Sequence, residues 1–565
     1  MNDEAGHPGG PPASRGDGRP SDARFPSLDA SVLAELSRYG ETRSVAAGDV
    51  LFRAGDESYD FVVVLEGEVE IVRSVEGSDT VITAFGPGRF LGELSLITGQ
   101  RVYVTARVSR TGRVLMISPV AFRLLMGSRP EIADTIFTAF VARREAMQVG
   151  PASRGVQIIG SRYSADTLAL LDFANRSRLP HTWIDLEDAD DVEALLAHIG
   201  ITPEDSPVVV TPTAVLRRCS PQQFAAHLGL AYHATPGRVF DLVVIGTGPA
   251  GLAAAVYGAS EGLDTLSIDA VGVGGQAGAS SRIENYVGFP SGVAGQDLTA
   301  GAAIQAERLG ASLASPVAAV GLRIEHGFHR VALADGRDIL CRSAIVATGA
   351  RYRRLAVDDL ERFEGAGVYY AATELEARLL SDQEVIVVGS GNSAGQAAIY
   401  LAQHGSRVSI AFRRDDLATT MSRYLIARIQ SHPGIKLLPH TEARELSGVS
   451  HLDCVTLEDT ATWTRHTVPC SGLFCFIGAD PATAWLGETV TQDTDGFILT
   501  DLALPDSVRA RALFAGRQPL PYETSVPGIF AVGDVRHGSI KRVASAVGEG
   551  SGAVRSVHNY IASPS

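Results

Sequence analysis

The sequence predicts a multidomain protein whose larger, C-terminal part is an α/β structure with two parallel sheets. Two glycine loops support this prediction, since residues 241–251 read DLVVIGTGPAG and residues 384–394 read EVIVVGSGNSA. In each case an apolar strand runs into a glycine-rich turn, and a segment of helical composition follows. A third observation concerns the N-terminal part, where short β-runs between glycine-containing turns predict a small barrel or jelly roll followed by helices.

The first glycine loop has the G-x-G-x-x-G spacing at Gly246, Gly248 and Gly251. The first glycine permits the tight turn, the second lets the backbone approach a pyrophosphate, and the third allows close helix–strand packing. A second strand, TLSID, ends at Asp269, about 20 residues further on, where a carboxylate can accept a ribose hydroxyl. The segment therefore predicts a Rossmann-like domain that binds a dinucleotide at the helix N-terminus.

The second loop repeats the spacing with Gly389, Gly391 and Ala394, and Asn392 and Ser393 open its helix. Two such domains in one chain predict two dinucleotides, and an enzyme that holds two dinucleotides passes electrons between them.

Composition limits the alternatives. A chain of 565 residues is long enough for three or four domains. Its net charge of −15 argues against a nucleic-acid or anionic-membrane surface. We find no apolar stretch of membrane-spanning length, no signal sequence and no His/Cys cluster with the spacing of a metal site. The five cysteines are scattered without a C-x-x-C pair, so we expect a cytoplasmic protein with reduced thiols.

Residues 1–25 lack large apolar side chains and are expected to be disordered. Residues 26–150 carry the short β-runs and a helical tail from Pro119 to Gln148, and they resemble a cyclic nucleotide-binding domain. Gly92 and Glu93 match the family's Gly-Glu, in which the Glu accepts the ribose hydroxyl. Arg101 stands one position before the place of the family's phosphate-binding Arg, where this chain has Val102, so a cyclic phosphate would lose that charge-assisted contact. Both a cAMP-like ligand and a structural role, or another ligand, stay open.

Residues 151–235 alternate strands and helices and resemble a thioredoxin or glutaredoxin domain. Pro207 stands where that family keeps a cis-proline. The loop that holds the family's dithiol has Ser161 and Ser164 at the sulfur positions. Because serine cannot form a disulfide, we expect this domain to be a redox-inert spacer or docking surface.

From residue 236 the chain resembles the low-molecular-weight thioredoxin reductases. The resemblance implies an FAD-binding domain at 236–357 and 478–565, an inserted NAD(P)H-binding domain at 358–477, and a homodimer. Besides the first glycine loop, the motifs that it assigns to FAD are Gly275, Gln276, Asn285, Ala347, Thr348, Gly349, Gly533, Asp534, Lys541, Arg542 and Val543.

The chain departs from this family at the redox dithiol. Ala371 and Glu374 occupy the two sulfur positions of the family's C-A-T-C. Neither side chain can exchange a disulfide, so the family's route from flavin to thioredoxin is closed. Cys470 and Cys475 lie in an apparent β-run, too far apart in an extended strand to be bridged, and are expected to be core residues.

Arg413 and Arg414 follow the strand after the second glycine loop. In the family, an arginine pair at this place binds the 2′-phosphate of NADPH, which suits guanidinium geometry. Ala418 replaces a further arginine of the family, so NADH stays an alternative.

The predicted function is that of an FAD-containing, NADPH-dependent oxidoreductase. Its electron acceptor is unidentified and is a redox protein, a quinone, oxygen, a small disulfide or a disulfide carried by a partner. The alternative is a regulatory scaffold that uses the bound coenzymes, or a nucleotide at the N-terminal domain, as a sensor.

Overall fold

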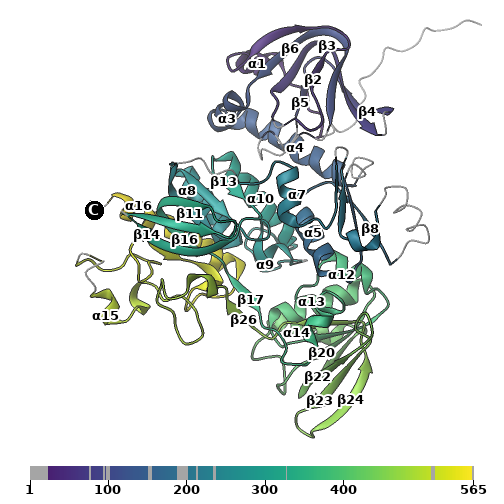
Figure 1. Ribbon diagram of the computed structural model, residues 1–565, viewed down its shortest axis with the longest axis vertical. Coiled ribbons are helices and arrows are strands. Elements are labelled where there is room, and N and C mark those ends of the chain that lie inside the picture. Colours follow the sequence, from purple (N-terminus) through teal and green to yellow (C-terminus); the bar gives the residue numbers. More distant parts are fainter. Residues whose placement is uncertain are drawn as a thin grey trace, which may run out of the picture. The chain divides into compact units, whose positions relative to one another are not determined.

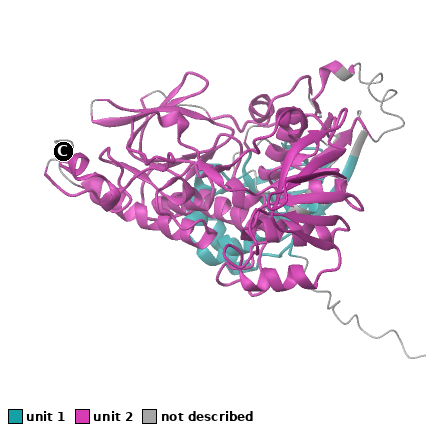
Figure 2. Ribbon diagram, turned by 90° about the horizontal axis from the view of Figure 1, so that it is seen from below, with its two compact units in different colours: residues 1–53, 59–96, 104–146 teal, residues 54–58, 97–103, 147–565 magenta. Residues whose placement is uncertain are grey.

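A computed structural model of the chain describes residues 23–56, 58–75, 78–92, 96, 102, 104–149, 156–187, 201–211, 214–232, 237–280, 282–325, 327–510, 514 and 516–562 (Figure 1). The chain divides into two compact units, which Figure 2 distinguishes by colour. The smaller unit comprises residues 1–53, 59–96 and 104–146, and the larger comprises residues 54–58, 97–103 and 147–565. Within the described residues, no helix is both long and apolar enough to cross a membrane.

The smaller unit is built on an antiparallel sheet with the order β1-β6-β3-β4, in which β2 also pairs with β6 and β5 with β3. Its elements are α1 (Ala30–Leu36), β1 (Glu41–Val45), β2 (Val50–Phe52), β3 (Phe61–Val75), β4 (Ser78–Phe85), β5 (Phe90–Leu91), β6 (Thr105–Ile117), α3 (Pro119–Ser128) and α4 (Pro130–Val149). The core contains four fully buried rings, those of Phe61, Phe90, Phe122 and Phe140, so α3 and α4 close the sheet with aromatic side chains.

Two local details shape this unit. Gly67 lies inside the continuous strand β3, where the backbones of β3 and β6 approach closely: a Cβ on Gly67 would stand 2.4 Å from the carbonyl oxygen of Arg110. The helical tail expected from Pro119 to Gln148 consists of two helices. The first ends at Ser128 and Arg129 is non-helical, since Pro130 disfavours helical backbone in the residue before it.

In the larger unit, the residues from 156 to 232 form what we call the middle segment. It has a β-strand, a helix and a parallel strand, followed by an antiparallel pair and a helix. These are β7 (Gln157–Gly160), α5 (Ala165–Arg176), β8 (Thr182–Asp185), β9 (Val208–Val210), β10 (Val215–Leu216) and α7 (Pro221–His227). The sheet order is β10-β9-β7-β8, and the Ser206–Pro207 peptide bond is cis. The helix expected from the sequence DVEALLAHIG lies outside the described residues.

The first α/β module comprises residues 237–352 and 479–562. Its sheet order is β13-β12-β11-β16-β15-β14, with β27 beside β16, and β11, β12, β13, β16 and β27 run parallel. The elements are β11 (Val239–Ile245), α8 (Pro249–Ser260), β12 (Thr265–Ile268), α9 (Gly275–Gly278), α10 (Gly295–Arg308), β13 (Ser312–Ala314), β14 (Ala319–Glu325), β15 (Phe328–Leu333), β16 (Asp338–Val346), β27 (Ile529–Ala531) and α16 (Val543–Ala562). Helices α8 and α16 pack so closely that a Cβ on Gly550 would stand 2.0 Å from the carbonyl oxygen of Ala250.

The second α/β module, residues 353–478, has the parallel order β18-β25-β19-β20-β21. The elements of this sheet and its helices are β18 (Val368–Tyr369), α12 (Glu374–Leu379), β19 (Glu384–Val388), α13 (Asn392–Gln403), β20 (Arg407–Ala411), α14 (Arg423–Ser431), β21 (Ile435–Leu438) and β25 (Gly472–Cys475). A short antiparallel pair, β17 (Ala350–Tyr352) with β26 (Ala479–Pro481), carries the chain into and out of this module.

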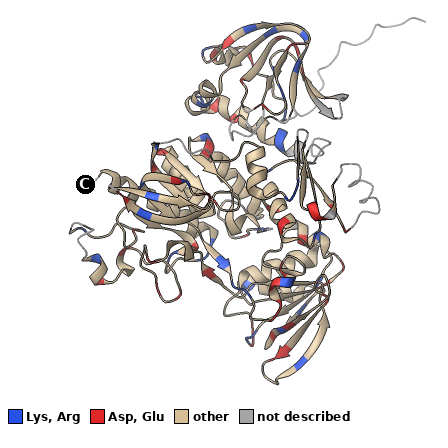
Figure 3. Ribbon diagram, in the orientation of Figure 1, with Lys and Arg blue, Asp and Glu red and all other residues tan. Residues whose placement is uncertain are grey.

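The second module also carries a three-stranded antiparallel sheet of β22 (Thr441–Ser447), β23 (Cys454–Asp459) and β24 (Thr464–Pro469). Figure 3 shows residues of both charges side by side on these strands. Glu458 accepts hydrogen bonds from Arg444 and Arg465, each at 2.7 Å. The arginines here are therefore neutralised by neighbours and do not form a basic surface.

Candidate functional site

The three glycines of the first loop differ in backbone conformation and in the space around them. Gly246 has φ +108°, and a Cβ there would stand 2.3 Å from the carbonyl oxygen of Ala347. A Cβ on Gly251 would stand 1.8 Å from the carbonyl oxygen of Gly246. Gly248, by contrast, is the N-cap of α8 without a side-chain cap, and a Cβ there would meet only the Cα of Gly275, at 3.9 Å. The space beside Gly248 at the start of α8 is therefore open, which fits a pyrophosphate at the helix N-terminus.

Asp269 lies at the end of β12, as expected, but its carboxylate is already engaged. One oxygen accepts from the backbone N–H and the hydroxyl of Thr247, at 2.8 and 3.0 Å. The other accepts from the backbone N–H groups of Val271 and Gly272, at 3.0 and 3.1 Å. Asp269 thus ties the glycine loop to the segment that leads to α9, and the sequence alone could not reveal these backbone partners.

The second loop has the same division of roles. Gly389 has φ +141°, and a Cβ there would stand 2.4 Å from the carbonyl oxygen of Phe476. Gly391 is the N-cap of α13, and a Cβ there would meet no atom within 4 Å. Asn392 accepts a 2.7 Å hydrogen bond from the backbone of Ser422, and Ala394 is fully buried. The open space in front of α13 fits the phosphates of a second dinucleotide.

Further residues that the sequence analysis predicts to contact FAD lie in the turn after β16 and in the short helix α9. After β16, the backbone N–H of Ala347 donates to Ile245, the hydroxyl of Thr348 donates to Ala482 at 2.9 Å, and Gly349 has φ +68°. Gln276 belongs to α9, and its amide donates to the carbonyl oxygen of Ala350. These bonds connect Gln276 and Thr348, both predicted to contact FAD, to the connecting pair β17–β26 and the residue that follows it.

The turn after β27 contains Gly533 and Asp534. The backbone N–H of Gly533 donates to the buried carboxylate of Glu549 at 2.7 Å, and Glu549 is also paired with Arg536 at 2.7 Å. Burial raises the pKa of Asp534, and the neighbouring Lys541 opposes this shift. Glu549 thus fixes the turn from α16, a role that the sequence analysis did not identify.

The remaining residues predicted to contact FAD lie near these turns. Lys541 and Arg542 are exposed before α16, and Val543 begins that helix. The Lys541 amine lies over the ring of Phe497, 4.7 Å from its centroid. Asn285 lies in the irregular segment between α9 and α10, beside Glu284, which pairs with Arg428 of the second module at 2.6 Å.

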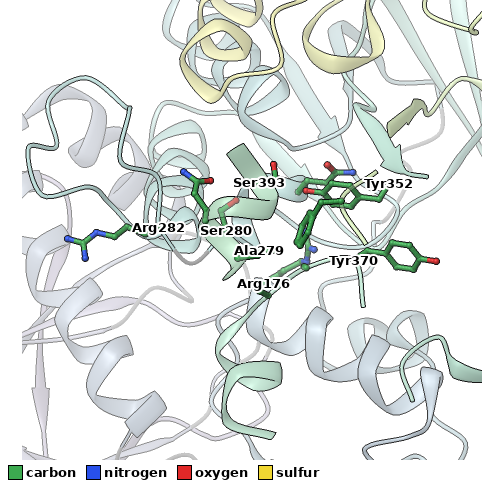
Figure 4. A pocket seen from close by; sticks show the side chains of 13 residues that line it. Arg176, Ala279, Ser280, Arg282, Tyr352, Tyr370 and Ser393 are labelled. Atoms are coloured by element: carbon green, nitrogen blue, oxygen red, sulfur yellow. The ribbon is translucent and has the colours of Figure 1, made fainter. Parts of the chain in front are cut away.

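A cavity of about 220 Å³ opens between these elements. Its lining comes from the middle segment and from both α/β modules: Arg176, Gln276, Ala279, Ser280, Arg282, Tyr352, Tyr370, Ala371, Ala372, Ser393, Gln396, Ala397 and Phe476 (Figure 4). Tyr352 from β17 meets Phe476 edge to face, with the ring centroids 5.6 Å apart. Burial and the charge of Asp534 raise the pKa of Tyr352, whereas its hydrogen bond with Ser393 opposes the shift. The cavity thus lies between the start of α13 and the connecting strand β17.

Ala371, the residue that the sequence analysis expects at the first sulfur position, lines this cavity together with Gln276. Glu374 begins α12, and its side chain lies outside the part of the chain that the structure describes. All five cysteines are free. Burial raises the pKa of Cys470 and Cys475 to about 12 each, so these two buried thiols are poor nucleophiles at neutral pH.

Arg413 and Arg414 follow β20 and are exposed. Arg413 lies 3.7 Å from Glu442, and Arg414 donates to the hydroxyl of Thr419 at 3.2 Å.

In the smaller unit, Gly92 has φ +131°, and its carbonyl oxygen accepts a 2.6 Å hydrogen bond from Arg143 of α4. Glu93 and Arg101 lie outside the described residues. Nothing in the local sequence marked Arg143 as a partner of this segment.

These features define an α/β protein with two dinucleotide sites in one compact unit. Residues 240–550 match the model of the pyridine nucleotide-disulphide oxidoreductase family, and the chain belongs to that family of flavoprotein oxidoreductases. Residues 42–129 match the cyclic nucleotide-binding domain. Membership implies FAD and NAD(P)H as cofactors, and it confirms the predicted class of enzyme.

The relatives agree with this assignment. The chain is 30% identical to the thioredoxin reductase of Bacillus subtilis over 57% of this chain and 95% of that protein. It is 31% identical to the thioredoxin reductase of Treponema pallidum over 57% of this chain and 97% of that protein. The crystal structure of Lactococcus lactis thioredoxin reductase in the FR conformation matches with a TM-score of 0.51 and 29% identity, over 57% of this chain and 99% of that one. The protein is thus a thioredoxin reductase-like oxidoreductase with an N-terminal cyclic nucleotide-binding domain.

Proposed function

We propose that this protein oxidises NADPH through bound FAD and delivers the electrons to an acceptor without using a redox dithiol of its own. FAD, when bound, supplies the chemistry that accepts a hydride and passes the electrons on. The observation that carries the proposal is that the cavity beside Gln276 is lined by Ala371, where the resemblance to thioredoxin reductases expects a sulfur.

The chain's own residues support the two coenzyme sites. Gly248 and Gly391 leave open space in front of α8 and α13, so backbone N–H groups are available for phosphates at both places. The exposed pair Arg413 and Arg414 supports NADPH over NADH, because guanidinium groups suit a 2′-phosphate. The deeply buried Cys470 and Cys475 support a flow of electrons that bypasses thiols.

The middle segment supports the same conclusion. Its sheet order, with a parallel pair β7–β8 and antiparallel β9 and β10, is the arrangement that we propose to be thioredoxin-like. Ser161 and Ser164 stand in its first loop, so the segment supplies no sulfur there. We also propose, from the resemblance to thioredoxin reductases, a cytoplasmic homodimer whose acceptor is a small redox protein or a quinone.

The acceptor test compares NADPH oxidation with three acceptors: a benzoquinone, ferricyanide and oxidised thioredoxin. We expect turnover with one of the first two and none with thioredoxin. The same rates are expected after replacing Cys470 and Cys475 with alanine. Efficient reduction of thioredoxin that disappears in this double variant would overturn the proposal.

A second function, a regulatory scaffold, is favoured by one observation. Leu375, in the helix that follows Ala371, packs against the core of the middle segment. A conformational change at the cavity lined by Ala371 would therefore alter the packing of Leu375 against the middle segment, whose first loop has no cysteine. If NADPH leaves the bound flavin oxidised, this second function replaces the first.

A further inference from the structure

The C-terminal end of helix α5, in the middle segment, lies against residues 272–276 of the first module, a loop that contains Gly275 and Gln276, both predicted to contact FAD. Arg176, the last residue of α5, donates a 2.8 Å hydrogen bond from Nη1 to the carbonyl oxygen of Gly275. Its Nε donates to Asp172, one helical turn earlier, also at 2.8 Å. The Arg176 side chain is only 18% exposed, so this guanidinium is held in place rather than free in solvent.

The loop that Arg176 contacts also lies against Gly248 of the first glycine loop, where a pyrophosphate is predicted to bind. Gly274 and Gly275 have φ +107° and +55°, and a Cβ on Gly275 would stand 2.8 Å from the Cα of Gly248. The stem of Arg176 covers the start of the same loop, since a Cβ on Gly272 would stand 3.0 Å from the Arg176 Cδ. Arg176 of the middle segment thus contacts the loop 272–276, which in turn lies next to Gly248.

Neighbouring contacts keep α5 at this place. The amide of Gln296 in α10 donates to the carbonyl oxygen of Asn175 at 3.2 Å. Arg178 lies 3.8 Å from Asp297. Arg176 differs from Arg178 because it lines the cavity together with Gln276, as Figure 4 shows for Arg176.

We propose that Arg176 is a positioning residue of the flavin site and that the middle segment is thereby a working part of the oxidoreductase. The inference rests on the proposed function, because it requires FAD in the first module. The hydrogen bond to Gly275 holds the loop in its left-handed conformation. The positive charge at the cavity favours the cofactor after it has gained electrons, because a cation beside a flavin stabilises its more negative form.

The test uses the full-length protein with Arg176→Gln, which keeps the stem against Gly272 but removes the charge, and Arg176→Lys, which keeps the charge. The matched control is Arg178→Gln, at the same interface. We expect the dissociation constant for FAD, measured by flavin fluorescence on the apoprotein, to rise about tenfold in Arg176→Gln and less than twofold in the control.

The flavin midpoint potential is the readout that a purely structural contact would not change. If Arg176→Gln weakens the binding of reduced FAD tenfold more than the binding of oxidised FAD, the two-electron potential of the bound flavin falls by about 30 mV. Arg176→Lys should restore the potential. Wild-type affinity and potential in Arg176→Gln, or equal losses in the control, would overturn the inference alone. A wild-type protein that binds no FAD would overturn the proposed function as well.

Discussion

Replacing Gly391 with alanine should weaken coenzyme binding while leaving the fold intact. Gly391 is the N-cap of α13 with φ −88°, a conformation that alanine adopts freely, and a Cβ there meets no atom within 4 Å. The loss at the N-cap is therefore small, up to about 1 kcal/mol of stability. By contrast, alanine at Gly389 would combine φ +141° with a 2.4 Å approach to the carbonyl oxygen of Phe476, and should damage the module itself.

The magnitude follows from the space that the new methyl group fills. If the phosphates of NADP⁺ approach the backbone at Gly391, the methyl overpacks the complex by about 1–3 kcal/mol. The dissociation constant would rise by roughly 5- to 150-fold. Calorimetric titration of NADP⁺ into the FAD-loaded protein measures this directly. The control is Gly301→Ala in α10, where a Cβ likewise meets no atom within 4 Å. Wild-type affinity in Gly391→Ala, or an equal loss in Gly301→Ala, would refute the reasoning.

Three further predictions concern other groups. Replacing Arg413 and Arg414 together with alanine should lower kcat/KM for NADPH at least tenfold and leave that for NADH nearly unchanged, so an unaltered ratio of the two coenzymes would contradict their role. The Cys470→Ala/Cys475→Ala variant should retain the wild-type rate of flavin reduction in stopped-flow measurements, because both thiols are buried and free, and a rate loss exceeding tenfold would speak against core roles. Burial lowers the pKa of His329 to about 4, below its ordinary value of 6.5. Because the unfolded chain then binds the proton at a higher pH than the folded protein does, the free energy of unfolding falls as the pH drops from 6.5 towards 4. The total loss is about 3 kcal/mol. In urea melts of the flavin-loaded protein at pH 7.5 and 5, His329→Phe should lose less stability on acidification than the wild type, and equal losses would show that His329 is not the group responsible.

The parts of the fold that the sequence predicts well are those encoded within a short stretch. The strand–turn–helix units around Gly246 and Gly389 are such cases, because each depends on a positive φ and a close backbone approach that glycine alone meets without cost. The break before Pro130 also has a local cause, the restriction that proline places on the preceding residue, although the sequence analysis did not predict it.

The cavity could not be predicted in this way. Arg176, Tyr352 and Phe476 come from segments far apart in the chain, and each is an ordinary residue in its own helix or strand. An acidic residue at the end of β12 signals a carboxylate at the loop, but only the three-dimensional structure shows that Asp269 is engaged by the backbone of Thr247 and Gly272. Burial of Glu549 beneath Gly533 likewise depends on the return of α16 to the first module.

The most direct test of the account is anaerobic visible spectroscopy of the purified protein before and after addition of one equivalent of NADPH. The account predicts a flavin spectrum that bleaches promptly, and equally so in the Cys470→Ala/Cys475→Ala variant. A bound flavin that NADPH leaves oxidised would contradict the account, since the two coenzyme sites would then bind without exchanging electrons.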